Sequence, residues 1–171
     1  MTKIYYSDIE TTGLLHQLVE QGDKAKLHNF CAMDAETDKM WTLHDYSKIT
    51  KFLDRDIILV MHNGICYDKN ALIHFGFDIS KVHFVDTLAL SWYLDLNRDK
   101  HGLESYGEEA GVPKPEIKDW ESLTQADYDN VKKLIELTKT INAILPQPEE
   151  TEERVNIDIE MNGTGDMHFK L

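Results

Sequence analysis

The sequence is short of cysteine, of basic residues and of long apolar runs. Its two cysteines, Cys31 and Cys66, have no CxxC spacing, so buried free thiols are favoured over a disulfide or a zinc site. Lys and Arg total 18 against 31 Asp and Glu, and the formal net charge is −13. This charge argues against a broad cationic surface for binding nucleic acid, so a polyanionic ligand would need metal ions or a local basic patch.

Apolar residues are present but never in a membrane-length run. No stretch approaches the ~20 apolar residues of a membrane span, and no basic segment followed by an apolar one stands at the N-terminus. We therefore expect a soluble cytoplasmic protein without a membrane partner. The 171 residues and 42% hydrophobic content predict one folded domain over 1–145, followed by an acidic linker and tail over 146–171.

Strands and helices are expected to alternate along residues 1–145. Residues 27–33 and 40–43 flank a turn-like stretch and predict a hairpin after a first strand, and the continuous apolar run at 56–63 is typical of a buried parallel strand. The remaining expected elements are helices at 45–53, 67–76, 101–111 and 124–145, and a strand passing into a helix over 82–94. The fold class is therefore α/β, with a mixed sheet of three antiparallel strands and then parallel strands, flanked by helices. In the tail, Val155, Ile157 and Ile159 alternate like a single edge strand.

Two carboxylates stand at the end of the first expected strand. Asp8 and Glu10 are two residues apart, so an extended backbone places both on the same face. The apolar and aromatic residues around them indicate a central strand, where a pair of carboxylates is costly unless a cation is bound. The pair therefore predicts a cation site, although an isolated Asp-x-Glu is more often a charged surface edge.

A third carboxylate, Asp68, falls in the first turn of the helix that follows the strand at 56–63. Helix N-termini favour anions, so an ionised Asp68 could simply cap its helix. The alternative is that it joins Asp8 and Glu10 from a neighbouring strand, and the pairing of the three favours this second interpretation.

Four stretches together resemble a known family: SDIETTGL (7–14), VMHNGICYDKNAL (60–72), VDTLALSWYL (85–94) and HGLESYGEEAGVPK (101–114). In this order and spacing the chain resembles the DEDD, or DnaQ-like, 3′→5′ exonucleases of RNase H-like fold. It is most similar to the proofreading exonuclease domain of phage family-A DNA polymerases. The resemblance covers residues 1 to about 145.

The resemblance implies roles for twelve residues. Asp8, Glu10 and Asp68 would be catalytic and would ligate Mg²⁺ or Mn²⁺, ions that prefer oxygen ligands. The resemblance implies a two-ion site, and a site with one ion is the alternative for this chain. The terminal nucleotide and its strand would be bound by a second group of residues, which are Thr11, Thr12, Gly13, Leu14, His62, Asn63 and Tyr67. Asp86 and Thr87 would support the site or cap the next helix.

The last motif of the family is not found. It pairs a tyrosine or histidine with a fourth carboxylate one helical turn later, but Tyr128 is followed four residues on by Lys132. Helical periodicity puts Thr138 near the centre of the inward face and Glu136 toward solvent. The resemblance, through the Ile141-Asn142 pair that follows, implies that Thr138 holds the place of the acid and Leu134 that of the tyrosine. The expected inward stripe comprises Val131, Leu134, Ile135, Thr138, Ile141, Asn142 and Leu145. Asp158 or Glu160 of the tail is an alternative source of the fourth acid.

Three hypotheses follow from these residues. The first is a metal-dependent 3′→5′ exodeoxyribonuclease of proofreading type that acts on single-stranded DNA ends in a phage-infected or bacterial cytoplasm, with a polymerase or other replication protein as partner. The second is a catalytically impaired exonuclease-fold protein that works by binding nucleic acid or a partner protein. The third is a structural α/β domain with a charged sheet edge.

Overall fold

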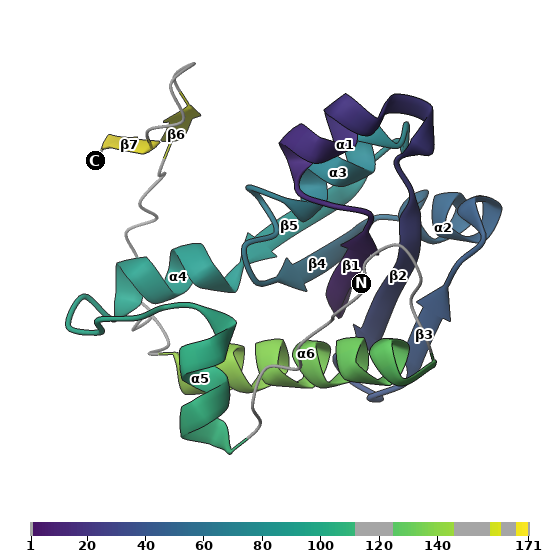
Figure 1. Ribbon diagram of the computed structural model, residues 1–171. Helices are drawn as coiled ribbons and strands as arrows, with labels where there is room; N and C mark the ends of the chain where they lie inside the picture. Colours follow the sequence, from purple (N-terminus) through teal and green to yellow (C-terminus); the bar gives the residue numbers. More distant parts are fainter. Residues whose placement is uncertain (1, 112–124, 146–157, 162–166, 171) are drawn as a thin grey trace.

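A computed structural model describes residues 2–111, 125–145, 158–161 and 167–170. Its main sheet has five strands in the order β3-β2-β1-β4-β5, with β1 antiparallel to β2 and parallel to β4 (Figure 1). The strands are β1 (Lys3–Thr11), β2 (Leu27–Asp34), β3 (Met40–Leu43), β4 (Ile57–Met61) and β5 (Val82–Asp86). The mixed α/β fold predicted from the sequence is confirmed, including the three antiparallel strands that precede the parallel ones.

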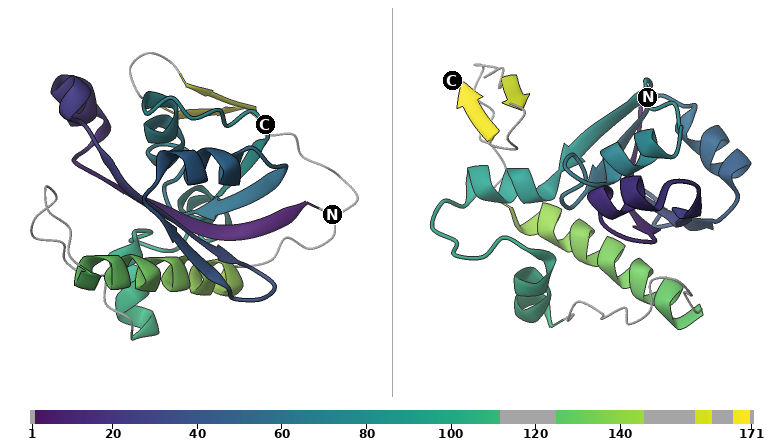
Figure 2. Two further views of the ribbon diagram at one scale, coloured as in Figure 1. Left: turned by 90° about the vertical axis from the view of Figure 1, so that its right-hand side faces the viewer. Right: turned by 45° about the horizontal axis from the view of Figure 1, so that its top comes forward.

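Helices cover both faces of this sheet. The helix α6 (Gln125–Ile144) lies across one face, while α1, α2 and α3 lie on the other (Figure 2). The bounds of the other helices are α1 (Leu15–Gln21), α2 (Tyr46–Leu53), α3 (Asp68–His74), α4 (Thr87–Leu94) and α5 (Leu103–Ala110), with a 3₁₀ turn at Gly22–Lys24. None of the helices in the described ranges has the length and apolar character needed to cross a bilayer.

The side chains of β1 alternate between the two faces. Tyr5 and Ile9 belong to the core beneath α1, α2 and α3, whereas Tyr6 packs toward a second cluster that includes Cys31 and Ile135. Asp8 and Glu10 follow Tyr6 in the two-residue period of a strand and therefore share its face, the one that α6 covers. The sheet thus directs both acids toward α6.

Two features of the fold differ from the sequence-based prediction. No helix was expected between residues 14 and 26, yet α1 forms there, and Gln17 Oε1 accepts a hydrogen bond from the backbone N–H of Leu14 at 2.8 Å. The signal was a Gln at the third helical position, which can close the first turn onto the capping residue. The prediction of a single edge strand in the tail is also wrong, because β6 (Asp158–Met161) pairs with β7 (Met167–Lys170) in a separate two-stranded sheet. Val155 and Ile157 lie outside the described residues.

Candidate active site

Asp68 joins β1 to α3 at the point where β4 has ended. The parallel pairing of β1 with β4 extends only to Tyr6 and Val60, so the backbone N–H of Ile9 lies beyond the end of β4. Asp68 Oδ1 accepts a hydrogen bond from this N–H at 3.3 Å. The bond holds Asp68 against the segment of β1 that carries Asp8 and Glu10.

The three predicted carboxylates interact electrostatically. Burial raises the pKa of Asp68 well above its usual value, and the charges of Asp8 and Glu10 raise it further. Asp68 is only 3% exposed and Glu10 only 6%, while Asp8 is half-buried. Like charges held this close in a poorly hydrated site repel each other, and a bound cation would relieve that repulsion.

The raised pKa of Asp68 predicts a pH-dependent loss of stability. The folded protein retains a proton that the unfolded chain releases at a lower pH, so stability falls as pH rises from the unfolded pKa to the folded pKa and is level above it. Asp68→Asn should therefore raise the melting temperature of the metal-free protein at neutral pH, by about 2–4 °C for each kcal/mol of repulsion relieved. Thermal melts from pH 4 to 8 check this, and a variant that melts below wild type at neutral pH would contradict it.

The carboxylate oxygens of Asp8, Glu10 and Asp68 do not surround a common point in this structure. Within the described part of the chain, no group of three or more His, Cys, Asp and Glu side chains is arranged to hold a metal ion as it stands. The chemistry of the donor set nevertheless fits a hard divalent cation, because it offers anionic oxygens whose mutual repulsion an ion would offset. Binding would require the side chains to turn toward the ion.

The loop after β1 is tied to α3 by a small hydroxyl network. The hydroxyl of Tyr67 donates to the carbonyl oxygen of Gly13 at 2.6 Å and lies 2.5 Å from the Thr11 hydroxyl, which also bonds to Gly13 O at 2.8 Å. Leu14, at the tip, is 58% exposed. The structure thus brings Thr11, Gly13 and Tyr67 together, and the charges of Asp68, Glu10 and Asp8 act on Tyr67. The side chain of Thr12 bonds to Gln21 and Lys26 instead.

The other two predicted nucleotide-binding residues follow β4. His62 Nδ1 lies 3.0 Å from the Thr87 hydroxyl, and its ring makes an edge contact with Tyr106. Asn63 is exposed and has a positive φ of 64°, a conformation that asparagine tolerates better than most residues. The amide side chain of Asn63 is therefore open to solvent, while His62 packs between β4 and the helices α4 and α5.

Asp86 anchors the loop that carries Asn63. Its carboxylate accepts hydrogen bonds from the backbone N–H groups of Asn63 at 2.9 Å, Ile65 at 3.0 Å and Leu88 at 2.9 Å. The carboxylate of Asp86 therefore both supports the loop after β4, through Asn63 and Ile65, and caps α4, through Leu88. Asp86 is only 5% exposed, so these bonds replace hydration that the carboxylate cannot obtain.

Removing this anchor should be costly. Asp86→Ala is expected to destabilise the fold by about 2–4 kcal/mol, because it leaves three part-buried backbone N–H groups without their acceptor. Denaturant unfolding measures the loss. Asp45→Ala is the matched control, since Asp45 caps α2 through Ser47 and Lys48 on the surface and anchors no loop. An equal loss in the two variants would contradict the anchoring role.

In the described part of α6, the inward positions expected for the fourth acid and the tyrosine hold Thr138 and Leu134. Thr138 is 2% exposed and Leu134 is 7% exposed, whereas Glu136 is exposed. The Thr138 hydroxyl donates to the carbonyl oxygen of Leu134 at 3.0 Å, so it is used within the helix. The rest of the expected stripe is also confirmed, with Val131, Ile135, Ile141 and Leu145 buried and Asn142 half-buried.

Thr138 lies over the acidic part of β1. Three residues before it, Ile135 packs in the cluster with Cys31, the strand partner of Asp8. Four residues after it, Asn142 Nδ2 donates to the Tyr6 hydroxyl at 3.3 Å. A carboxylate at position 138 would therefore face the same acids. The side chains of Asp158 and Glu160 are not among those that the structure describes, so the tail alternative stays a prediction.

A hollow of about 610 Å³ lies between α6 and the β2–β3 hairpin. Its lining residues are Met33, Asp38, Met40, Thr42, Lys132, Glu136 and Lys139. Lys139 Nζ and Asp38 Oδ1 form an ion pair of 2.5 Å in this lining. None of the predicted site residues lines the hollow, so it is separate from the carboxylates.

The sequence matches no protein-family model and no curated protein closely enough to establish a family. Solved structures are similar in fold. Brucella melitensis NrnC bound to pGG is 19% identical with a TM-score of 0.63, over 84% of this chain and 72% of NrnC. NrnC with bound Mg²⁺ is 21% identical with a TM-score of 0.59, over 84% of this chain and 73% of NrnC.

Two further proteins share the arrangement over a smaller part of their length. Phi29 DNA polymerase with primer-template DNA is 12% identical with a TM-score of 0.55, over 81% of this chain and 30% of the polymerase. Escherichia coli RNase D, an exoribonuclease, is 18% identical with a TM-score of 0.53, over 83% of this chain and 39% of RNase D. The special closeness to phage polymerases stays a prediction, because the TM-scores for NrnC are at least as high. At these identities the comparisons establish the fold alone, which is the RNase H-like α/β fold that these nucleases share.

Proposed function

We propose that this protein is a metal-dependent 3′→5′ exonuclease that removes nucleotides from single-stranded DNA ends. The observation that carries the proposal is that Asp68 is bonded to the segment of β1 that carries Asp8 and Glu10, where burial and the charges of these two acids raise the pKa of Asp68. The nuclease fold supports it, as do the Mg²⁺ and the pGG bound by NrnC.

Each residue of the site has a task in this proposal. Bound Mg²⁺ or Mn²⁺ would stabilise charge on the phosphate and activate the attacking water. Asp8, Glu10 and Asp68 would supply the ligand oxygens. The exposed Leu14 would contact the terminal base, and the exposed Asn63 would reach the sugar or phosphate of the strand.

The direct test is shortening of a 5′-labelled single-stranded oligonucleotide. With Mg²⁺ or Mn²⁺ the product ladder should lose one nucleotide at a time from the 3′ end, and EDTA should stop the loss. DNA and RNA of the same sequence are compared, because RNase D acts on RNA and its fold is similar. Absence of release with both ions and both nucleic acids would overturn the proposal.

A second candidate function is favoured by Thr138. With Thr138 at the position implied for the fourth acid, the site would hold an ion against a phosphate yet lack the full set of ligands for hydrolysis. The protein would then bind single-stranded ends, or a polymerase or other replication protein, without cleaving. Metal-dependent retention of an oligonucleotide with no shortening over hours would favour this function over the first.

A further inference from the structure

A buried amide lies next to the carboxylates on the same face of the sheet. Asn29 of β2 is the antiparallel strand partner of Glu10 and is 0% exposed. Directly paired residues of antiparallel strands project to the same face, with Cβ atoms about 4.5–5.5 Å apart. Asn29 therefore stands beside Glu10, beneath α6.

Only one end of this amide has a partner. Asn29 Oδ1 accepts a weak hydrogen bond from the thiol of Cys31 at 3.8 Å, whereas the side-chain nitrogen Nδ2 is buried and has no hydrogen-bond partner among the described residues. A buried donor without an acceptor costs about 1–3 kcal/mol. An unpartnered buried donor in a native structure needs an explanation, and we infer that it gains an acceptor when the neighbouring carboxylates change conformation.

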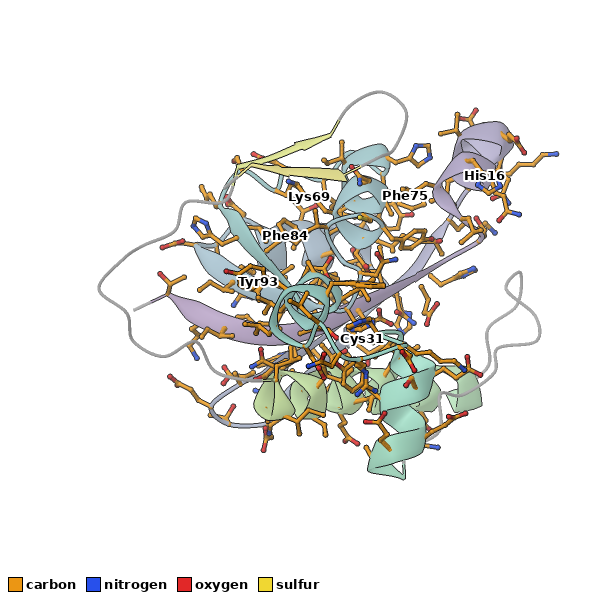
Figure 3. The ribbon with its side chains drawn as sticks, turned by 90° about the vertical axis from the view of Figure 1, so that its left-hand side faces the viewer. His16, Cys31, Lys69, Phe75, Phe84 and Tyr93 are labelled. Atoms are coloured by element: carbon orange, nitrogen blue, oxygen red, sulfur yellow. The ribbon has the colours of Figure 1, made fainter. Side chains whose placement is uncertain are left out.

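The side chains around Asn29 create a negative electrostatic potential. Burial raises the pKa of the Cys31 thiol to about 12, and the charges of Asp8 and Glu10 contribute to the rise. Cys31 lies where the sheet meets α6, as its label in Figure 3 shows. An N–H donor in this field is attracted to a carboxylate oxygen, and the side chain of Glu10, the strand partner of Asn29, projects from the same face of the sheet.

We propose that Asn29 is a positioning residue that holds Glu10 in its ion-binding orientation, which rests on the proposed function. When Glu10 turns one oxygen toward a divalent cation, its other oxygen accepts a hydrogen bond from Asn29 Nδ2. The bond compensates the buried donor and fixes the ligand. Outer hydrogen bonds of this kind change metal affinity by about 10- to 100-fold.

A matched pair of substitutions tests the role of the donor. Asn29→Val and Asn29→Thr have nearly the same shape and both suit a strand, but only threonine keeps a donor. We expect the valine variant to bind Mn²⁺ at least about tenfold more weakly than wild type, and the threonine variant to lie closer to wild type. Isothermal titration calorimetry with Mn²⁺ alone gives the affinities, and each variant's unfolding midpoint shows that it folds.

Two controls distinguish positioning from a merely structural effect. Ser7 also has a buried hydroxyl without a partner among the described residues, but it lies on the opposite face of β1 from Glu10, so Ser7→Ala should leave Mn²⁺ affinity unchanged. In a background of Glu10→Ala, Asn29→Val should have no further effect on affinity, because the two residues act through one bond.

The outcomes separate this inference from the proposed function. Wild-type protein that binds no divalent ion would overturn both. Wild-type protein that binds Mn²⁺ while Asn29→Val binds it equally well would overturn the role of Asn29 and leave the proposed function standing. Equal weakening by valine and threonine would also contradict it, because the donor would then not be what matters.

Discussion

Thr138→Asp is expected to raise Mg²⁺-dependent nucleotide release about 10- to 100-fold, because it would add a fourth carboxylate to the three proposed ligands. Thr138 is buried on the inward face of α6, over the part of β1 that carries Asp8. The resemblance to DEDD exonucleases places the fourth acid at this position. The initial rate of release from a single-stranded oligonucleotide measures the gain.

The same substitution should have an opposite effect on the metal-free protein. A fourth carboxylate beside three others raises the repulsion, so the melting temperature without metal should fall and should recover when Mg²⁺ is added. Thr140→Asp is the matched control, since Thr140 makes the same hydroxyl-to-carbonyl bond within α6 but is exposed. If the two aspartate variants gave the same rate and the same melting behaviour, position 138 would not face the carboxylates.

Asp8→Ala is expected to reduce nucleotide release by at least about 100-fold and to abolish most of the stabilisation by Mg²⁺. Asp8 is the half-buried member of the three acids, and its charge contributes to the raised pKa of Asp68. Removing it takes away both a ligand and the repulsion that a cation relieves. The metal-free variant should therefore melt no lower than wild type.

Paired assays of release and of melting with and without Mg²⁺ measure both effects of Asp8→Ala. Glu20→Ala serves as the control, because Glu20 is an exposed acid on α1 that faces solvent. Unchanged release by the Asp8 variant would show that any nuclease activity in the preparation comes from elsewhere.

Local patterns were sufficient to predict the sheet and the position of its acids. The two-residue period of β1 put Asp8 and Glu10 on one face, and the stripe of α6 put Thr138 inward and Glu136 outward, as the structure confirms. These features depend on repeats within single elements, which the sequence contains directly.

Contacts between elements were harder to predict. The bond from Ile9 to Asp68 depends on β4 ending before β1 does, and the pairing of Asn29 with Glu10 depends on the register of β2. No periodicity within one strand specifies the register of another. The helix α1 was missed because it has only seven residues and its one clear signal is the side chain of Gln17.

The most direct test of the central claim is a crystal structure with Mn²⁺ and a short oligonucleotide, in which anomalous scattering locates the ions. For wild-type protein we expect one well-ordered Mn²⁺ bound by Asp8, Glu10 and Asp68, and a second ion in the Thr138→Asp variant. An ion-free cluster of these carboxylates at saturating Mn²⁺, with the oligonucleotide bound elsewhere or not at all, would contradict the claim that this site binds metal and nucleic acid.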